Sequence, residues 1–394
     1  MKTILFNGHD IVLLVVIYIS VLFAAITFFG RRDTSWTHLW LGFFLLSQAG
    51  LAVYVLALYG DGFHHWVINK APAAFALLEL VMWLEGPLLL LYTRSVLYQH
   101  LRFQLQDLIL LLPLLIYAVT LIVAVMGFEP EQGSSYLRFL RSEYIQFYEH
   151  LRNFFRAGFG FWALFIIRAY QRQLPNAYSN LDALCYTWLK FLVIGFIFIR
   201  LWGVFNLLTY TLLTFLLDDS GLELINFDLM GIMANYGQLL LVSLLLYFSL
   251  ADSRHILRVN IETLEGVVKT KNSHGYTAEQ VNRVKRHMEK KRPYLNSQLK
   301  IDDLAHQISV SPKLLSNLIN REFKMNFFEY INSYRVKEIC GYLANPDMSA
   351  QSAIDLAFRA GYNSKTSFNR LFKLETGSTP SQYRKTALKL VPIT

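Results

Sequence analysis

The sequence predicts an all-α protein in two parts: a polytopic transmembrane helix bundle, then an all-α domain in which a linker helix joins two helix-turn-helix units. The 394 residues are 54% hydrophobic and only 16% charged, whereas soluble globular chains are about 45–50% apolar and about 25% charged. Long apolar runs fill the chain before residue 252, and amphipathic helical segments without strand alternation follow residue 277. This length also predicts two or more domains, at about 150 residues each.

Seven apolar segments are long enough to cross a membrane, because about 20 helical residues span about 30 Å of hydrocarbon. The fifth is the weakest, since its apolar stretch between Arg156 and Arg168 is short and needs both arginines to reach toward the lipid headgroups. Buried helices of a large soluble protein are the alternative, which charge-free runs of this length disfavour. The predicted spans are 11–30, 36–59, 72–97, 108–128, 153–170, 188–217 and 229–251.

The charges of the short loops predict that Met1 lies outside and Thr394 inside the cell. With seven spans, every predicted inward loop is basic, and the outward loop 218–228 has four acidic residues and no Lys or Arg, which is the positive-inside bias. Omitting the fifth span would place the first basic pair outside. The inward basic residues are Arg31, Arg32, Arg94, Arg102, Arg168 and Arg172.

Composition divides the chain into a bundle at 1–251, a juxtamembrane helix and linker at 252–276, and a C-terminal domain at 277–394. In the juxtamembrane helix, apolar residues recur at spacings of 4, 3 and 4, which makes a narrow seam suited to a short homodimeric coiled coil. A helix that lies against the membrane or the next domain remains an equal alternative. The seam residues are Leu257, Ile261, Leu264 and Val268.

The C-terminal domain contains one helix-turn-helix pattern at 301–323. A short amphipathic helix at 301–308 precedes Ser311, which is suited to cap a second helix that begins at Pro312. Leu315, Leu318 and Phe323 form the apolar face of this second helix.

The pattern recurs about fifty residues later. A helix at 353–360 leads into the turn Gly361-Tyr362, and Ser364 opens a helix whose inward residues are Phe368, Leu371 and Phe372. A longer helix at 326–343 separates the two copies as a spacer. Two such second helices held about 34 Å apart enter consecutive major grooves of DNA.

The basic excess of the chain lies in this domain. Residues 277–394 contain 19 Lys/Arg and 10 Asp/Glu, a net charge of +9 that equals the net charge of the whole chain. A basic excess confined to one domain indicates a polyanionic partner.

The C-terminal motifs resemble the AraC/XylS-type helix-turn-helix transcription regulators over roughly residues 280–386. The resemblance implies binding to double-stranded promoter DNA, and the predicted topology places this binding at the inner face of a bacterial plasma membrane. Ser309, where the family often has Gly, and Cys340-Gly341 depart from the pattern. Glu85-Gly86-Pro87-Leu88 and the hydropathy more loosely resemble multi-span membrane sensor regions fused to this domain. The matching motifs are Leu304-Ala305, Ser311-Pro312, Leu315-Ser316, Asn326-Phe327-Phe328, Tyr334-Arg335, Asp355-Leu356-Ala357, Gly361-Tyr362, Ser364, Ser367-Phe368-Asn369-Arg370-Leu371-Phe372-Lys373, Thr376-Gly377, Thr379-Pro380 and Tyr383-Arg384.

The outward residues of the two second helices are the predicted DNA contacts, both by facing and by the resemblance. Arg370 suits a guanine edge because its guanidinium is a planar fork, whereas Lys365 and Lys373 suit phosphate. For any single position, an ordinary solvated helix surface is the alternative. The predicted contacts are Lys313, Ser316, Asn317, Asn320, Lys365, Thr366, Ser367, Asn369, Arg370 and Lys373.

Three charged residues lie within the predicted spans: Glu79, Glu85 and Arg200. An ionised group at mid-bilayer costs at least about 2.5 kcal/mol without a partner, and Glu85 and Arg200 lie at depths that allow them to pair. Such a pair is either a polar switch or ligand contact within the bundle, or a static pair that only stabilises the structure. His64-His65 in an outward loop lacks the spaced partners of a metal site, so no metal is predicted.

The sequence predicts a one-component, membrane-bound transcription regulator that contacts lipid and senses an external or membrane signal, either a small molecule or a protein. Neither an enzymatic function nor a cofactor is predicted, because the sequence has no Ser/His/Asp set, Walker loop or dinucleotide fingerprint. One alternative is a seven-span transporter or channel with a regulatory DNA-binding-like domain. A membrane enzyme is another, for which Glu79, Glu85, His38 and His64 are too sparse to define a site.

Overall fold

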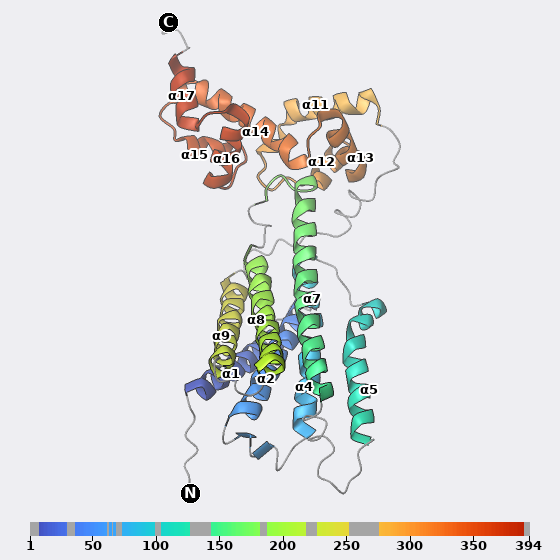
Figure 1. Cartoon of the computed structure of the whole chain (residues 1–394). Coiled ribbons are helices and arrows are strands. Elements are labelled where there is room, and N and C mark those ends of the chain that lie inside the picture. The colour runs from blue at the N-terminus through green and yellow to red at the C-terminus, as the bar shows by residue number, and fades with distance from the viewer. Residues whose placement is uncertain are drawn as a thin grey trace. The chain divides into compact units, whose positions relative to one another are not determined.

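The computed structural model describes the chain in ten stretches, and its helices are shown in Figure 1. Contacts divide the chain into two compact parts: a bundle part of Met1–Ile167 with Thr187–Arg254, and a C-terminal part of Arg168–Tyr186 with His255–Thr394. Within the described residues no strand occurs, and β-type pairing is limited to isolated bridges. The predicted all-α class is therefore confirmed. The described residues are 8–29, 36–60, 63–64, 66–67, 73–98, 104–126, 143–181, 187–217, 227–251 and 276–389.

The bundle part consists of long, largely apolar helices. α2 packs against α1, α4 and α9, while α8 packs against α9 and α4 against α5. Large apolar side chains remain exposed on these helices, among them Phe165 at 68% and Phe215 at 84%. The helices are α1 (Gly8–Phe29), α2 (Trp36–Tyr59), α4 (Ala73–Leu97), α5 (Leu112–Met126), α7 (Glu143–Gln173), α8 (Thr187–Leu217) and α9 (Phe227–Ala251).

Six helices in the described ranges are long and apolar enough to cross a membrane: α1, α2, most of α4, α8 and α9, and η1 (Leu105–Leu111) with most of α5. The predicted fifth span lies in α7, which is 31 residues long but is not among these six helices, because charged residues such as Arg156 and Arg168 interrupt its apolar sequence. The juxtamembrane seam of Leu257, Ile261, Leu264 and Val268 lies outside the described residues.

The C-terminal part contains the two predicted helix-turn-helix units. The first is α12 (Ile301–Gln307) with α13 (Pro312–Leu318), and the second is α15 (Ala353–Arg359) with α16 (Lys365–Thr376). α14 (Phe327–Ala344) is the predicted linker helix, and it packs against α15 and α16. The other elements of this part are η3 (Leu174–Asn176), α11 (Ala278–Lys291), η7 (Pro293–Leu295), η8 (Ile319–Phe323), η9 (Pro346–Met348) and α17 (Pro380–Lys389).

The helix starts follow the predicted capping chemistry. The Ser311 hydroxyl accepts a hydrogen bond from the Leu314 amide at 3.2 Å, and Pro312 occupies the first helical position. Ser364 likewise accepts from the Ser367 amide at 3.3 Å. Asn326 and Glu329 form a reciprocal capping box at the start of α14. Local sequence therefore sets where the second helix of each unit begins.

The turns of the two units need left-handed backbone. Ser309 has φ 55° and Gly361 has φ 94°, a region that disfavours side chains. A Cβ atom on Gly361 would lie 2.5 Å from the Tyr294 carbonyl oxygen. Glycine is therefore required at the second turn, while the serine at 309 adopts the conformation for which the family often has Gly.

Candidate functional site

The second helix-turn-helix unit presents one exposed polar face on α16. Phe368 and Phe372 point into the core, at 1% and 0% exposure, and join the cluster around α14 and α15. The predicted outward positions lie on the opposite side of the helix, where Ser367 is half-buried. The exposed ones are Lys365, Thr366, Asn369, Arg370 and Lys373.

The first unit has a smaller exposed face. Asn320 is exposed, and Lys313 and Asn317 are half-buried, so these three reach the surface as predicted. The outward orientation predicted for Ser316 is wrong, because its side chain is 3% exposed and accepts a hydrogen bond from the Asn320 amide at 3.3 Å. Ser316 precedes the buried Ile319 by three residues and therefore shares its face.

The same unit departs from regular helix after α13. Residues Ile319–Phe323 form a π-helical turn that ends at Lys324 with φ 57°, and such turns are often found at functional sites. Phe323, predicted to be inward, is only partly buried and packs against Tyr330, with the ring planes tilted and the ring centroids 4.7 Å apart. The wider turn shifts the later residues from the faces that regular spacing predicts.

A buried charge cluster centres on Glu85 of α4. Glu85 is 1% exposed. Its carboxylate accepts hydrogen bonds from Arg200 Nη2 at 2.9 Å and from the side-chain amide of Gln48 at 2.8 Å. The predicted pairing of Glu85 with Arg200 is therefore present. Arg156 of α7, 3% exposed, also contacts the same carboxylate.

Glu79 lies in a second buried group. Its carboxylate accepts hydrogen bonds from Tyr54 at 3.2 Å and from Tyr117, and Arg152 lies 3.9 Å away. Both Glu79 and Arg152 are buried. The tyrosine hydroxyls, which cost less to bury than ions, supply the contacts closest to this carboxylate.

Sequence reasoning missed most partners in these groups. Arg156 was predicted to reach the headgroups, and this is wrong because it is buried on Glu85. Its spacing of four from Arg152 places both arginines on one face of α7, a signal that could have indicated an inward basic stripe. Gln48 and Tyr54 on α2 gave no comparable signal.

The structure describes only one residue of the histidine pair His64-His65. His64 lies 3.3 Å from the Ala57 carbonyl oxygen, and His65 falls outside the described residues. No group of three metal-ligating side chains occurs in the part of the chain that the structure describes.

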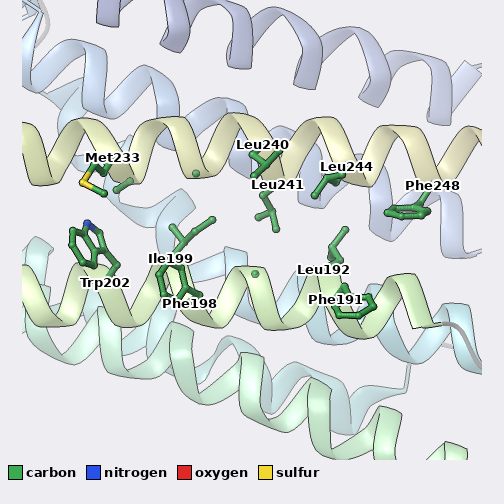
Figure 2. Close-up of a pocket in the computed structure, with 13 residues that line it drawn as sticks. Phe191, Leu192, Phe198, Ile199, Trp202, Met233, Leu240, Leu241, Leu244 and Phe248 are labelled. Carbon is green, nitrogen blue, oxygen red and sulfur yellow. The ribbon is translucent and has the colours of Figure 1, made fainter.

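An apolar cavity of about 270 Å³ lies between α8 and α9 of the bundle part. Figure 2 shows Phe198 and Trp202 of α8 on one side and Met233 and Leu240 of α9 on the other. None of its lining residues is charged. The cavity therefore suits an apolar molecule.

The pair of helix-turn-helix units, the spacer helix and the exposed α16 face together define a DNA-binding class of domain. The family model described as "Helix-turn-helix domain" matches residues 304–386. The chain belongs to the AraC-type helix-turn-helix transcription regulators.

Three similar proteins each match less than a quarter of this chain. The "Uncharacterized HTH-type transcriptional regulator YtdP" of Bacillus subtilis is 34% identical over 23% of this chain and 11% of its own length. The "Melibiose operon regulatory protein" of Escherichia coli is 28% identical over 22% and 28%, respectively. The "Probable transcription factor PqrA" of Proteus vulgaris is 31% identical over 23% of this chain and 71% of its own. No solved structure matches.

Proposed function

We propose that the chain is a membrane-embedded transcription regulator that binds promoter DNA through α13 and α16. The observation that carries this proposal is the exposed polar face of α16, with Arg370 between Lys365 and Lys373, on a domain of the AraC-type family. Arg370 pairs with a guanine edge, and the two lysines neutralise phosphates. Lys313, Asn317 and Asn320 supply the weaker contacts of the first unit.

The bundle part anchors this domain and receives the signal. Six apolar helices with exposed hydrophobic side chains support residence in lipid. α7 adds the seventh crossing, because its two central arginines are neutralised inside the bundle. Seven crossings leave Met1 outside and the C-terminal part at the cytoplasmic face of the bacterial membrane, in agreement with the basic inward loops.

DNA binding is tested by selecting duplexes from a random-sequence library with the purified full chain in detergent. We expect a defined motif to be enriched, and Arg370→Ala to broaden that motif at one base position. Enrichment of no motif by the unaltered chain would contradict the proposed function.

Topology is tested separately with alkaline phosphatase fused after Thr394. The enzyme is active only outside the cytoplasm, so we expect an inactive fusion at normal abundance. An active fusion would contradict the proposed orientation.

A further inference from the structure

The C-terminal part includes a short segment that precedes α8 in the sequence. After η3, residues Ala177–Ser179 pair with the stretch that leads into α12. The Ile301 amide donates to the Ala177 carbonyl at 3.0 Å, and the Ser179 amide donates to the Leu299 carbonyl at 3.3 Å. Tyr178 and Lys300 form the antiparallel bridge between these bonds. The segment is thus attached to the first helix-turn-helix unit through its backbone.

Arg335 of the linker helix α14 holds the same segment. Its Nη1 donates to the Ser179 carbonyl at 2.9 Å, and its Nη2 donates to the Ser179 hydroxyl at 3.2 Å. Its other bonds go to the carbonyl oxygens of Tyr294 at 2.8 Å and Asn296 at 2.8 Å. Two of these four bonds therefore depend on Ser179.

Arg335 also borders the second helix-turn-helix unit. Its guanidinium lies 5.8 Å from the centre of the Tyr362 ring, and a Cβ atom on Gly361 would lie 3.0 Å from its Nε. The side chain is 1% exposed, and burial lowers its pKa to about 10. Because a buried cation needs its full set of acceptors, loss of Ser179 would disturb the point where the two units meet.

We propose that the segment Leu174–Ser179 is a coupling element whose docking on Arg335 holds the two helix-turn-helix units at the separation that DNA requires. The segment is the direct continuation of α7, which carries Arg152 and Arg156 of the buried charge groups. A change at these charges therefore reaches the DNA-binding units through one helix and one backbone bridge. This inference rests on the proposed DNA binding.

The bridge offers a reversible lock. Tyr178 and Lys300 form a non-hydrogen-bonded pair, for which the Cα atoms are about 4.5 Å apart, within the range of a disulfide. Tyr178→Cys with Lys300→Cys, in a background of Cys185→Ser and Cys340→Ser, should form an intramolecular disulfide in the full chain. Comparing its oxidised and reduced forms controls for the lost lysine charge.

Ser179→Ala should weaken the docking of the segment. It removes the hydroxyl that donates to the Leu299 carbonyl and accepts a hydrogen bond from Arg335. Asn176→Ala, three residues earlier and half-buried, is the matched control. The probe is the duplex that the unaltered chain selects. We expect Ser179→Ala to weaken binding about tenfold, equivalent to about 1.4 kcal/mol, and Asn176→Ala to leave it unchanged.

The decisive arm combines Ser179→Ala with the cysteine pair. Oxidation of the cysteine pair should restore the affinity for the duplex, and reduction of the disulfide should remove it again. Both states are measured in the same folded protein. Failure of the disulfide to form, unchanged or tighter binding by Ser179→Ala, or no effect of oxidation would each overturn the coupling role. A chain that selects no duplex at all would instead contradict the proposed function.

Discussion

The two parts of the molecule bury opposite kinds of side chain. The bundle part buries Glu79, Glu85 and Arg200 while it exposes Phe215. The C-terminal part buries Phe372 and exposes its basic residues on α16. This contrast is the one expected if hydrocarbon surrounds the bundle part, as proposed above, because charges must be neutralised against hydrocarbon but are stabilised by water.

Arg335 is the exception within the C-terminal part. It is buried like the arginines of the bundle, but its four hydrogen bonds go to carbonyl oxygens and a hydroxyl. In the bundle, the arginines meet carboxylates. Dipoles thus support the buried cation of Arg335, whereas counter-charges support the buried arginines of the bundle part.

The largest effect expected to test this comparison is that of Glu85→Gln. Removing this carboxylate leaves Arg156 and Arg200 without their shared partner, which should lower the free energy of unfolding by about 3–5 kcal/mol. Arg200→Gln should cost less, because Arg156 still pairs with Glu85. Membrane abundance and thermal unfolding in detergent measure both variants. Equal losses of stability in the two variants would show that Arg156 and Arg200 do not share the negative charge of Glu85.

Combining Glu85→Gln with Arg200→Gln should recover only part of the stability, since Arg156 remains unpaired. Full recovery in this double variant would mean that Arg156 has another partner. If promoter output changes in these variants while abundance does not, the cluster also carries the signal.

Gly361→Ala should destabilise the C-terminal part by about 1–3 kcal/mol, because it forces a side chain into left-handed backbone against the Tyr294 carbonyl. Gly341→Ala is the matched control, since nothing lies within 4 Å of its Cβ position in the interior of α14. It should stabilise the helix by up to about 1 kcal/mol. Unfolding in urea distinguishes the two, and a neutral Gly361→Ala would contradict the assigned turn.

Arg370→Ala should cost about 1–3 kcal/mol of DNA affinity and loosen preference at a single base position. Binding to the selected duplex and to its single-base variants measures this. A loss that is the same for every sequence would show that Arg370 contacts phosphate instead.

Lys373→Ala should have the smallest effect. It should weaken binding to all sequences alike and reduce the salt slope by about 1, because one phosphate contact is lost. Affinities measured across a series of salt concentrations test this. A change of base preference in Lys373→Ala would show that Lys373 contacts a base, which is the role assigned to Arg370.

Local patterns predicted the helices because caps and apolar spacing act over a few residues. Ser311, Pro312 and Ser364 begin their helices as predicted. Ser316 was misplaced because its burial depends on Ile319, outside the apolar face that had been assigned. Arg156 and the docked segment were missed because their partners, Glu85 and Arg335, lie 71 and 156 residues away in the sequence. Periodicity along one helix does not report such contacts.

The proposed function requires that one chain is held in the membrane while it binds specific DNA. This claim is tested by chromatin immunoprecipitation from the washed membrane fraction of cells that express a tagged chain. We expect sequencing to reveal discrete promoter sites that share one motif, with Arg370→Ala reducing the enrichment at equal abundance. Recovery of the full-length chain in the soluble fraction, or membrane-bound chain without discrete sites, would contradict the claim.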